Sequence, residues 1–232
     1  MLRIATYNCL VGGSASRNGH IDRLLHDVGA HVVLSQEACA SASNGSGVYW
    51  RAVRGYRWGS GIHVSGLHAV EIPMRRFRGW VIGIEVQLFR RTRIFSVHCP
   101  AGEHGYVRTM HEILDALERQ RVGADIVIGG DFNVAAGYRG PSEPVRMSKG
   151  EREVLDRMTS QFKLIPCWQA MHPDTPLAQT LRWTANRAAP YHCDGIFIPR
   201  SWQPHLRSCE ILAGDPWEQM SDHNPVVAEL EI

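Results

Sequence analysis

The chain has 232 residues, of which 44% are hydrophobic and 21% are charged, and its formal net charge is +2. These values are ordinary for a globular protein with one hydrophobic core. The small net charge excludes a protein that binds its partners through its overall charge alone. We therefore expect a single domain over residues 1–232.

The sequence carries no signal for export or membrane insertion. No basic and apolar leader precedes the strand expected from Leu2, and no stretch approaches the ~18 apolar residues of a membrane span. None of the six cysteines forms a Cys-x-x-Cys pair. We therefore predict a cytoplasmic protein with free thiols and no membrane partner.

The first part of the chain predicts a strand, a helix and a second strand. Residues 2–8 (LRIATYN) alternate apolar and polar side chains, which is typical of a strand. Residues 18–30 (NGHIDRLLHDVGA) predict a helix that Asn18 opens and that ends near Gly29. Residues 31–38 (HVVLSQEA) predict a buried strand.

A loop is expected over residues 41–47 (SASNGSG), and most of the signals from residue 48 to residue 98 are those of strands. Residues 80–89 (WVIGIEVQLF) and 93–98 (RIFSVH) flank the tripeptide Arg-Arg-Thr, which predicts a tight turn. These two runs should therefore pair as a β-hairpin.

Two helices are expected in the second half of the chain. Residues 105–123 place apolar side chains at helical spacing, and residues 148–162 predict a helix capped near Ser148. A loop should cover residues 135–147. Further strands are expected over residues 124–130, 193–199, 206–212 and 225–232. Strands outnumber helices, which favours an α+β architecture with sheets in the core and helices covering them.

Polar residues stand where several of these strands begin or end. They are Asn8, Glu37, His98, Asp131, Asn133, Asp194, Asp222 and His223. If the strands lie in one or two packed sheets, these side chains can converge on one rim. Functional sites are often assembled in this way on a rigid scaffold.

The chemistry of this set suits hydrolysis of a phosphate ester. Carboxylates with an amide provide the oxygen ligands that Mg²⁺, Mn²⁺ or Ca²⁺ prefer, and histidines act as acids and bases near neutral pH. In an extended segment Asp131 and Asn133 would share a face and address the same phosphate. They could instead form an Asx-turn after the two glycines, and Ser221 with Asp222 could simply form a turn.

Six motifs occur in order and span residues 3–226: RIATYN, LSQEA, SVHCP, GGDFNV, CDGIFIP and SDHNPV. Together they resemble the endonuclease/exonuclease/phosphatase superfamily, which includes pancreatic deoxyribonuclease, exonuclease-III-type repair enzymes, sphingomyelinases and inositol phosphatases. The resemblance implies a two-sheet β-sandwich flanked by helices, in four layers α/β/β/α. It also implies a divalent-metal-dependent phosphoesterase.

The resemblance further implies a set of metal-binding residues. Glu37 is similar to the principal metal-binding glutamate of the family, with Asn8 beside it. Asp222 matches an acid that lies near the metal. The cofactor expected from this match is Mg²⁺ or Mn²⁺.

The catalytic roles follow from the same resemblance. His223 matches the histidine that activates or orients the attacking water, and Asp194 matches its carboxylate partner. Asp131 and Asn133 match the pair that positions the nucleophile and the phosphate. His98 matches a second histidine that donates a hydrogen bond or a proton to the phosphate.

The substrate is less closely defined than the chemistry. Exonuclease-III-type enzymes tend to have tyrosine where this chain has His98, which argues against a dedicated abasic-site enzyme. The loops over residues 135–147 and 211–220 match no subfamily. We expect a nuclease acting on DNA; the alternatives are a phosphatase or phosphodiesterase for a small phosphoester (nucleotide, inositol phosphate or lipid headgroup) and a non-catalytic binding module.

The cysteines leave a zinc site open as an alternative. Cys9, Cys99 and Cys193 each neighbour an expected site residue, and Cys39 lies two positions after Glu37. The usual ligand spacing of zinc sites is missing. Neighbours in a strand also point to opposite faces, so we expect these thiols to face the core.

Two further groups of residues favour a nucleic-acid surface, and each has a structural alternative. The arginines at positions 75, 76, 78, 90, 91 and 93 could line a track for a phosphate backbone, or could form the solvated face of a hairpin. The aromatic residues Trp50, Tyr56 and Trp58 could stack on bases, or could belong to the core.

Overall fold

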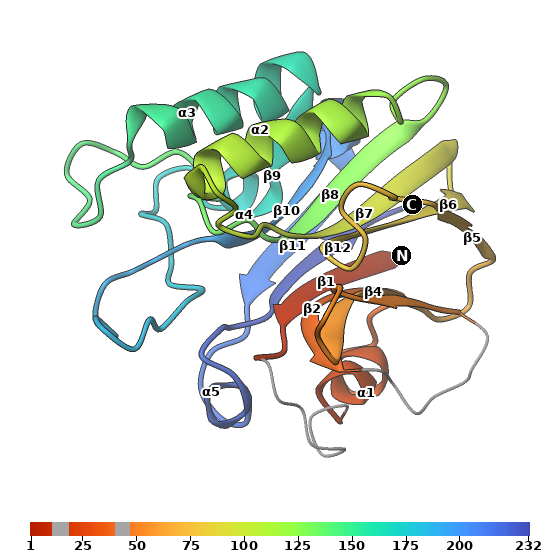
Figure 1. Cartoon of the computed structure of the whole chain (residues 1–232), viewed down its shortest axis with the longest axis horizontal. Coiled ribbons are helices and arrows are strands. Elements are labelled where there is room, and N and C mark those ends of the chain that lie inside the picture. The colour runs from red at the N-terminus through yellow and green to blue at the C-terminus, as the bar shows by residue number, and fades with distance from the viewer. Residues whose placement is uncertain (11–18, 40–46) are drawn as a thin grey trace.

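A computed structural model describes residues 1–10, 19–39 and 47–232. Its centre is a pair of six-stranded sheets, each of which mixes parallel and antiparallel neighbours (Figure 1). No helix within these ranges is long and apolar enough to cross a membrane. The predicted helix cap Asn18, and all of the predicted loop 41–47 except Gly47, lie outside the described residues.

The strands of the first sheet are β1 (Leu2–Asn8), β2 (Val32–Cys39), β3 (Val48–Ala52), β4 (Trp58–Val64), β11 (Leu206–Ile211) and β12 (Val226–Leu230). Those of the second sheet are β5 (Ala69–Ile72), β6 (Val81–Gln87), β7 (Arg91–His98), β8 (Asp125–Asp131), β9 (Leu164–Pro166) and β10 (Asp194–Pro199). The strand orders are β11-β12-β1-β2-β4-β3 and β5-β6-β7-β8-β10-β9.

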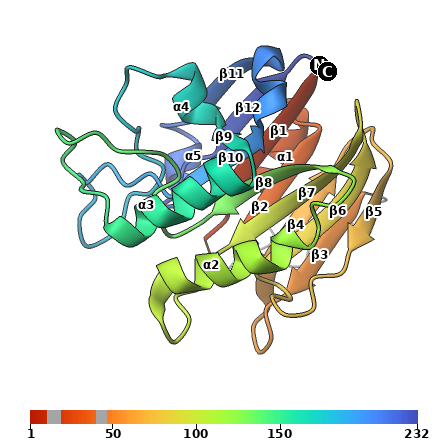
Figure 2. The same cartoon turned by 90° about the horizontal axis from the view of Figure 1, so that it is seen from above.

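Helices complete the four layers that the sequence predicts. The helices α2 (Gly105–Glu118) and α3 (Lys149–Asp156) cover the outer face of the second sheet (Figure 2). On the opposite side, α1 (Gly19–His26) and the short α5 (Trp217–Met220) cover the first sheet (Figure 1). The short α4 (Cys167–Met171) contacts strands of both sheets at one edge.

Apolar side chains from both sheets interdigitate to form the central core. Ile4 and Leu34 from the first sheet belong to one buried cluster with Ile84, Val127 and Ile196 from the second. A second cluster fills the space beneath α2 and α3, and a third lies beneath α1 and α5. Because burial of apolar surface is the main favourable term in folding, these three clusters fix how the layers stack.

Most predicted elements are present, with shifted ends. β6 and β7 form the expected hairpin, but its turn lies two residues earlier than predicted, because Arg91 and Thr92 already belong to β7 and pair with β6. α2 ends at Glu118 rather than near residue 123. Ser148 caps α3 through the capping box that it forms with Glu151. β9, α4 and α5 were not predicted, because segments of three to five residues are too short for periodicity.

The strand ends meet on one rim, remote from the paired chain termini. β1 begins where the Met1 amino group contacts the carbonyl oxygen of Ile232, and it ends at Asn8. In the second sheet His98 and Asp194 are the direct cross-strand neighbours of Asp131, one on either side. The topology therefore gathers polar strand ends from both sheets in one place.

Gly130 shows why glycine precedes Asp131. Its φ is +151°, and a Cβ at this position would lie 1.8 Å from the carbonyl oxygen of Val97 on the neighbouring strand. Any larger residue would therefore push β7 and β8 apart beside His98 and Asp131.

We expect Gly130→Ala to lower the free energy of unfolding by about 3 kcal/mol or more, because the backbone collision adds to the conformational strain. Gly123→Ala is the matched control: Gly123 also has a positive φ (+72°), but its Cβ would meet nothing within 4 Å. That variant should lose only about 1 kcal/mol. Urea unfolding measures both values, and equal losses would contradict the explanation.

Candidate active site

Asp131 lies at the centre of the rim and is only 2% exposed. Asn8 Nδ2, from the other sheet, donates a hydrogen bond of 2.9 Å to Asp131 Oδ2. The Asn133 backbone N–H donates to Asp131 Oδ1 at 3.0 Å. A buried carboxylate is stable only when hydrogen-bond donors such as these replace the water that it has lost. The two bonds keep the Asp131 carboxylate oriented, so that it can interact with a further donor or a cation.

Two histidines flank this carboxylate. His98 Nε2 and His223 Nε2 each lie 3.9 Å from Asp131 Oδ2, which is beyond direct hydrogen bonding. His98 Nε2 also lies 3.5 Å from Glu37 Oε1. Both imidazoles are buried, so their Nε2 atoms face a confined polar space that a third group can share.

Asp194 anchors His223 from behind. His223 Nδ1 lies 2.9 Å and 3.1 Å from the two carboxylate oxygens of Asp194, and an ionised carboxylate can only accept. The proton on Nδ1 is thereby fixed, and Nε2 is turned toward Asp131. Thr180 Oγ1 accepts from the backbone N–H groups of Cys193 and Asp194 and so holds the start of β10.

The turn that carries His223 is held by Ser221 and by Arg182, and the sequence did not reveal the part played by Arg182. Ser221 Oγ donates to the carbonyl oxygen of Asn8 at 2.8 Å and accepts from the His223 backbone N–H at 3.1 Å. The buried Arg182 donates to the carbonyl oxygens of Ser221 and His223 and to the side chain of Asn224. Ser221 does form the turn given as the structural alternative, and this turn positions His223.

The expectation that Asp131 and Asn133 share a face through an extended backbone is wrong. β8 ends at Asp131, and Asn133 has φ +51°. The two side chains meet because the chain folds into an Asx-turn, so the turn proposed as an alternative is also what builds the site. Glu37 likewise has φ +48°, at an irregularity in the pairing of β2 with β4. Strained backbone of this kind clusters at functional sites.

The predicted metal-binding residues offer oxygen atoms on the same rim. Asp222 Oδ1 is buried, has no hydrogen-bond donor and lies 3.9 Å from His223 Nε2. Glu37 follows Gln36, the cross-strand neighbour of Asn8, and its carboxylate reaches toward His98. The unpaired oxygen of Asp222 is a good ligand for a hard cation, and Glu37 and Asn8 add carboxylate and amide oxygens, so this set fits Mg²⁺ or Mn²⁺.

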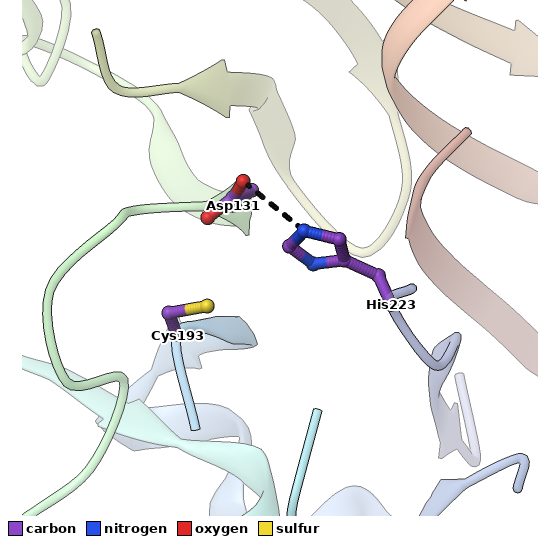
Figure 3. Close-up of side chains that lie close together, drawn as sticks. All are labelled: Asp131, Cys193 and His223. Atoms are coloured by element: carbon purple, nitrogen blue, oxygen red, sulfur yellow. Dashed lines mark ion pairs between the residues drawn. The ribbon is translucent and has the colours of Figure 1, made fainter. Parts of the chain in front are cut away.

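Cys193 departs from the expectation that the thiols face the core. Its Sγ lies among the polar groups, 3.6 Å from Asp194 Oδ2, and within 4.8 Å of the nearest ligand atoms of Asp131 and His223 (Figure 3). The expectation assumed that neighbouring residues of a strand point to opposite faces. It does not apply to Cys193, which precedes β10 rather than lying within it. All six cysteines are unpaired, as predicted, and Cys9 and Cys99 are buried.

Aromatic side chains continue the rim beyond His98. Trp58 and Trp80 have ring centroids 5.8 Å and 5.1 Å from that of His98, and the exposed Tyr56 lies 5.0 Å from Trp58. Trp58 is thus at the site, whereas Trp50 donates to the carbonyl oxygen of Ala38 and packs on the core. Of these four aromatic residues, Trp80 alone was not named from the sequence, because it lies in no motif that distinguishes it.

The predicted arginine track is not supported at its second half. Arg91 and Arg93 both pair with Glu85, at 2.8 Å and 2.9 Å. Arg91 begins β7 and His98 ends it, which places the two about 23 Å apart along an extended strand. Arg76 pairs with Glu112 at 2.6 Å. Arg76 and Arg91 are exposed and fit the solvated face given as the alternative, whereas the side chain of Arg93 is largely buried.

Local charge sets the pKa values of the buried histidines. Burial, with a smaller contribution from the charge of Arg139, lowers the pKa of His192 to about 4, although its bond to the Ala178 carbonyl opposes this. His223 is equally buried, but Asp194 and Asp131 outweigh the effect of burial and raise its pKa to about 10. Burial lowers the pKa of His98 below its usual value. Burial and the neighbouring Asp194 raise that of the Cys193 thiol well above its usual value.

In the metal-free protein we expect His223 to be protonated at pH 8, because its pKa of about 10 exceeds that pH. NMR titration of the imidazole carbons would measure this, with His192 as the buried control that stays neutral. Asp194→Asn should lower the pKa of His223 by about two pH units, since it removes the nearest opposite charge. A neutral His223 at pH 7 in the metal-free protein would contradict this electrostatic account.

The sequence matches no protein-family model and no curated protein. Among solved structures, the fold is similar to an AP endonuclease from Archaeoglobus fulgidus, with a TM-score of 0.75, 16% identity and 100% of both chains covered. It is similar to the endonuclease domain of TRAS1, a telomere-specific non-LTR retrotransposon, with a TM-score of 0.72 and 14% identity over 100% of this chain and 99% of that one. It is also similar to the 3′ phosphatase NExo from Neisseria bound to a product DNA hairpin, with a TM-score of 0.70, 18% identity and 100% of both chains covered. The chain therefore shares the fold of these solved structures, with the four α/β/β/α layers that the sequence predicts.

Proposed function

We propose that this chain is a divalent-metal-dependent phosphodiester hydrolase that acts on DNA, with residues 1–232 as one catalytic domain. The observation that carries the proposal is the convergence on Asp131 of two histidines and an amide from both sheets. Acids, amides and histidines in this arrangement are the groups needed for attack of water on phosphorus. The six unpaired cysteines favour a cytoplasmic setting.

In this proposal Glu37, Asn8 and Asp222 hold Mg²⁺ or Mn²⁺. The donor set consists of two carboxylates and an amide oxygen, and the unpaired Oδ1 of Asp222 is available to a cation. When bound, the cation polarises the phosphate and its charge favours the neutral form of His223.

The remaining residues handle the proton and the phosphate. Neutral His223 keeps its proton on Nδ1 against Asp194 and presents the bare Nε2 as general base to a water molecule. Asp131 orients that water, and Asn133 fixes Asp131 through its backbone N–H. His98 Nδ1 has no hydrogen-bond partner, so a proton on this atom would be a buried donor without an acceptor. The favoured tautomer therefore carries its proton on Nε2. His98 then donates this hydrogen bond to the phosphate oxygen.

Features around the rim favour DNA over a small phosphoester. Trp58 and Trp80 offer aromatic faces beside His98, on which bases next to the reacting phosphate can stack. Beyond Asp222, a polar cavity of about 630 Å³ is lined by Arg23 and Arg187, which suit neighbouring backbone phosphates. The similar solved structures include a DNA-bound phosphatase and two endonucleases, which agrees with this choice.

His223→Ala and Asp131→Asn should each lower the rate of plasmid cleavage about 10³-fold or more, because each removes a group that acts on the water. Circular dichroism and thermal unfolding should stay close to those of the unaltered protein. The control is His68→Ala, an exposed histidine away from the rim, which should keep its activity. Turnover near the unaltered rate in either site variant would refute the mechanism.

Trp58→Ala should raise the KM for DNA roughly tenfold, in line with the ~1–3 kcal/mol of one base–aromatic stack. Hydrolysis of bis-p-nitrophenyl phosphate, which has no bases, should change much less. Phe89→Ala serves as the control, since Phe89 is 49% exposed and follows β6 at the far end of the β6–β7 hairpin. An equal loss on both substrates would mean that Trp58 supports the structure of the site and does not bind bases.

A further inference from the structure

Three potential metal ligands from separate segments converge at the proposed water site. A carboxylate oxygen of Asp131, the sulfur of Cys193 and a ring nitrogen of His223 all lie within 4.8 Å of one another. Figure 3 shows the three side chains directed into a common space, from the end of β8 and from the segments that precede β10 and β12. All three residues are buried.

The geometry identifies which nitrogen of His223 is available. Nδ1 is bound to Asp194, so Nε2, at 3.9 Å from Asp131 Oδ2, is the free ligand atom. A histidine that donates its other N–H to a carboxylate is the usual arrangement of a metal-binding histidine. Asp194 therefore also orients His223 for a cation.

The ligand types select the metal. A thiolate, an imidazole and a carboxylate suit Zn²⁺ and chemically similar cations, whereas Mg²⁺ prefers oxygen atoms alone. Zinc bonds of about 2.0–2.3 Å in tetrahedral geometry place ligand atoms about 3.3–3.6 Å apart. Separations of up to 4.8 Å would have to shorten by about 1.2–1.5 Å on binding, with solvent or a phosphate oxygen as the fourth ligand.

We propose that Asp131, Cys193 and His223 form a zinc site distinct from the Mg²⁺ or Mn²⁺ site, and that zinc bound there inhibits the enzyme. Inhibition rests on the proposed function, because zinc would occupy His223 Nε2 and the carboxylate that orient and activate water. Binding releases two protons to solvent, the thiol proton of Cys193 and the Nε2 proton of the protonated His223 imidazole. A cavity of about 420 Å³ lined by Cys193 and Asn133 provides the route of entry.

Binding is tested first without any assay of activity. Co²⁺ replaces Zn²⁺ as the probe, since a cobalt–thiolate bond gives a charge-transfer absorption band. The metal-free full chain should bind one Co²⁺ with this band, and Zn²⁺ should displace it. Cys193→Ser should abolish the band, and His223→Gln should weaken binding at least about tenfold. The matched control is Cys99→Ser, because Cys99 is also buried and unpaired near the site but is not a member of the cluster.

Inhibition is tested by adding Zn²⁺ to the Mg²⁺-dependent cleavage of plasmid DNA, with each variant normalised to its own rate without zinc. Cys193→Ser should need at least about tenfold more Zn²⁺ for half-inhibition than the unaltered protein or Cys99→Ser. The proposal is overturned if the unaltered protein gives no cobalt–thiolate band, if the band survives Cys193→Ser, or if zinc inhibits all three proteins equally. A band that depends on Cys193 in a protein without phosphodiesterase activity would support the zinc site and refute the proposed function.

Discussion

The hydrogen bond between Asn8 and Asp131 joins the two sheets at the point on which the candidate site depends. Asn8 ends β1 in the first sheet, and Asp131 ends β8 in the second. The two strands share no backbone pairing, so their relative height is set by side-chain packing between the sheets. A displacement of one residue along either strand, about 3.3 Å, would break this bond, and such a displacement of β8 would also move Asp131 relative to His223.

Two buried residues outside the candidate site, Thr180 and Arg182, hold its parts in position. Thr180 supports the segment that carries Asp194, and Arg182 clamps the turn that carries His223. Both come from the irregular segment between α4 and β10. Because Arg182 supplies several charge-assisted hydrogen bonds at once, it can fix a turn that has no regular structure of its own. The same supports that position the proposed catalytic groups also keep the Cys193 thiol among them.

Much of the fold could be predicted from the sequence, since long strands and helices leave periodic patterns. β1 begins and ends as expected, and the capping box at Ser148 marks the start of α3. The candidate residues were found because strand-terminal polar side chains stand out against apolar runs. What could not be predicted depends on tertiary contacts: the Asx-turn at Asp131, the orientation of Cys193, the role of Arg182, and the approach of Trp80 to His98.

Metal-dependent cleavage of DNA by the unaltered protein tests the central claim most directly. Supercoiled plasmid and bis-p-nitrophenyl phosphate would be incubated in parallel with Mg²⁺ or Mn²⁺, and again with EDTA. The account predicts nicking of the plasmid that requires the cation and stops with EDTA. Hydrolysis of the small ester without any nicking, or nicking that continues in EDTA, would contradict a metal-dependent nuclease.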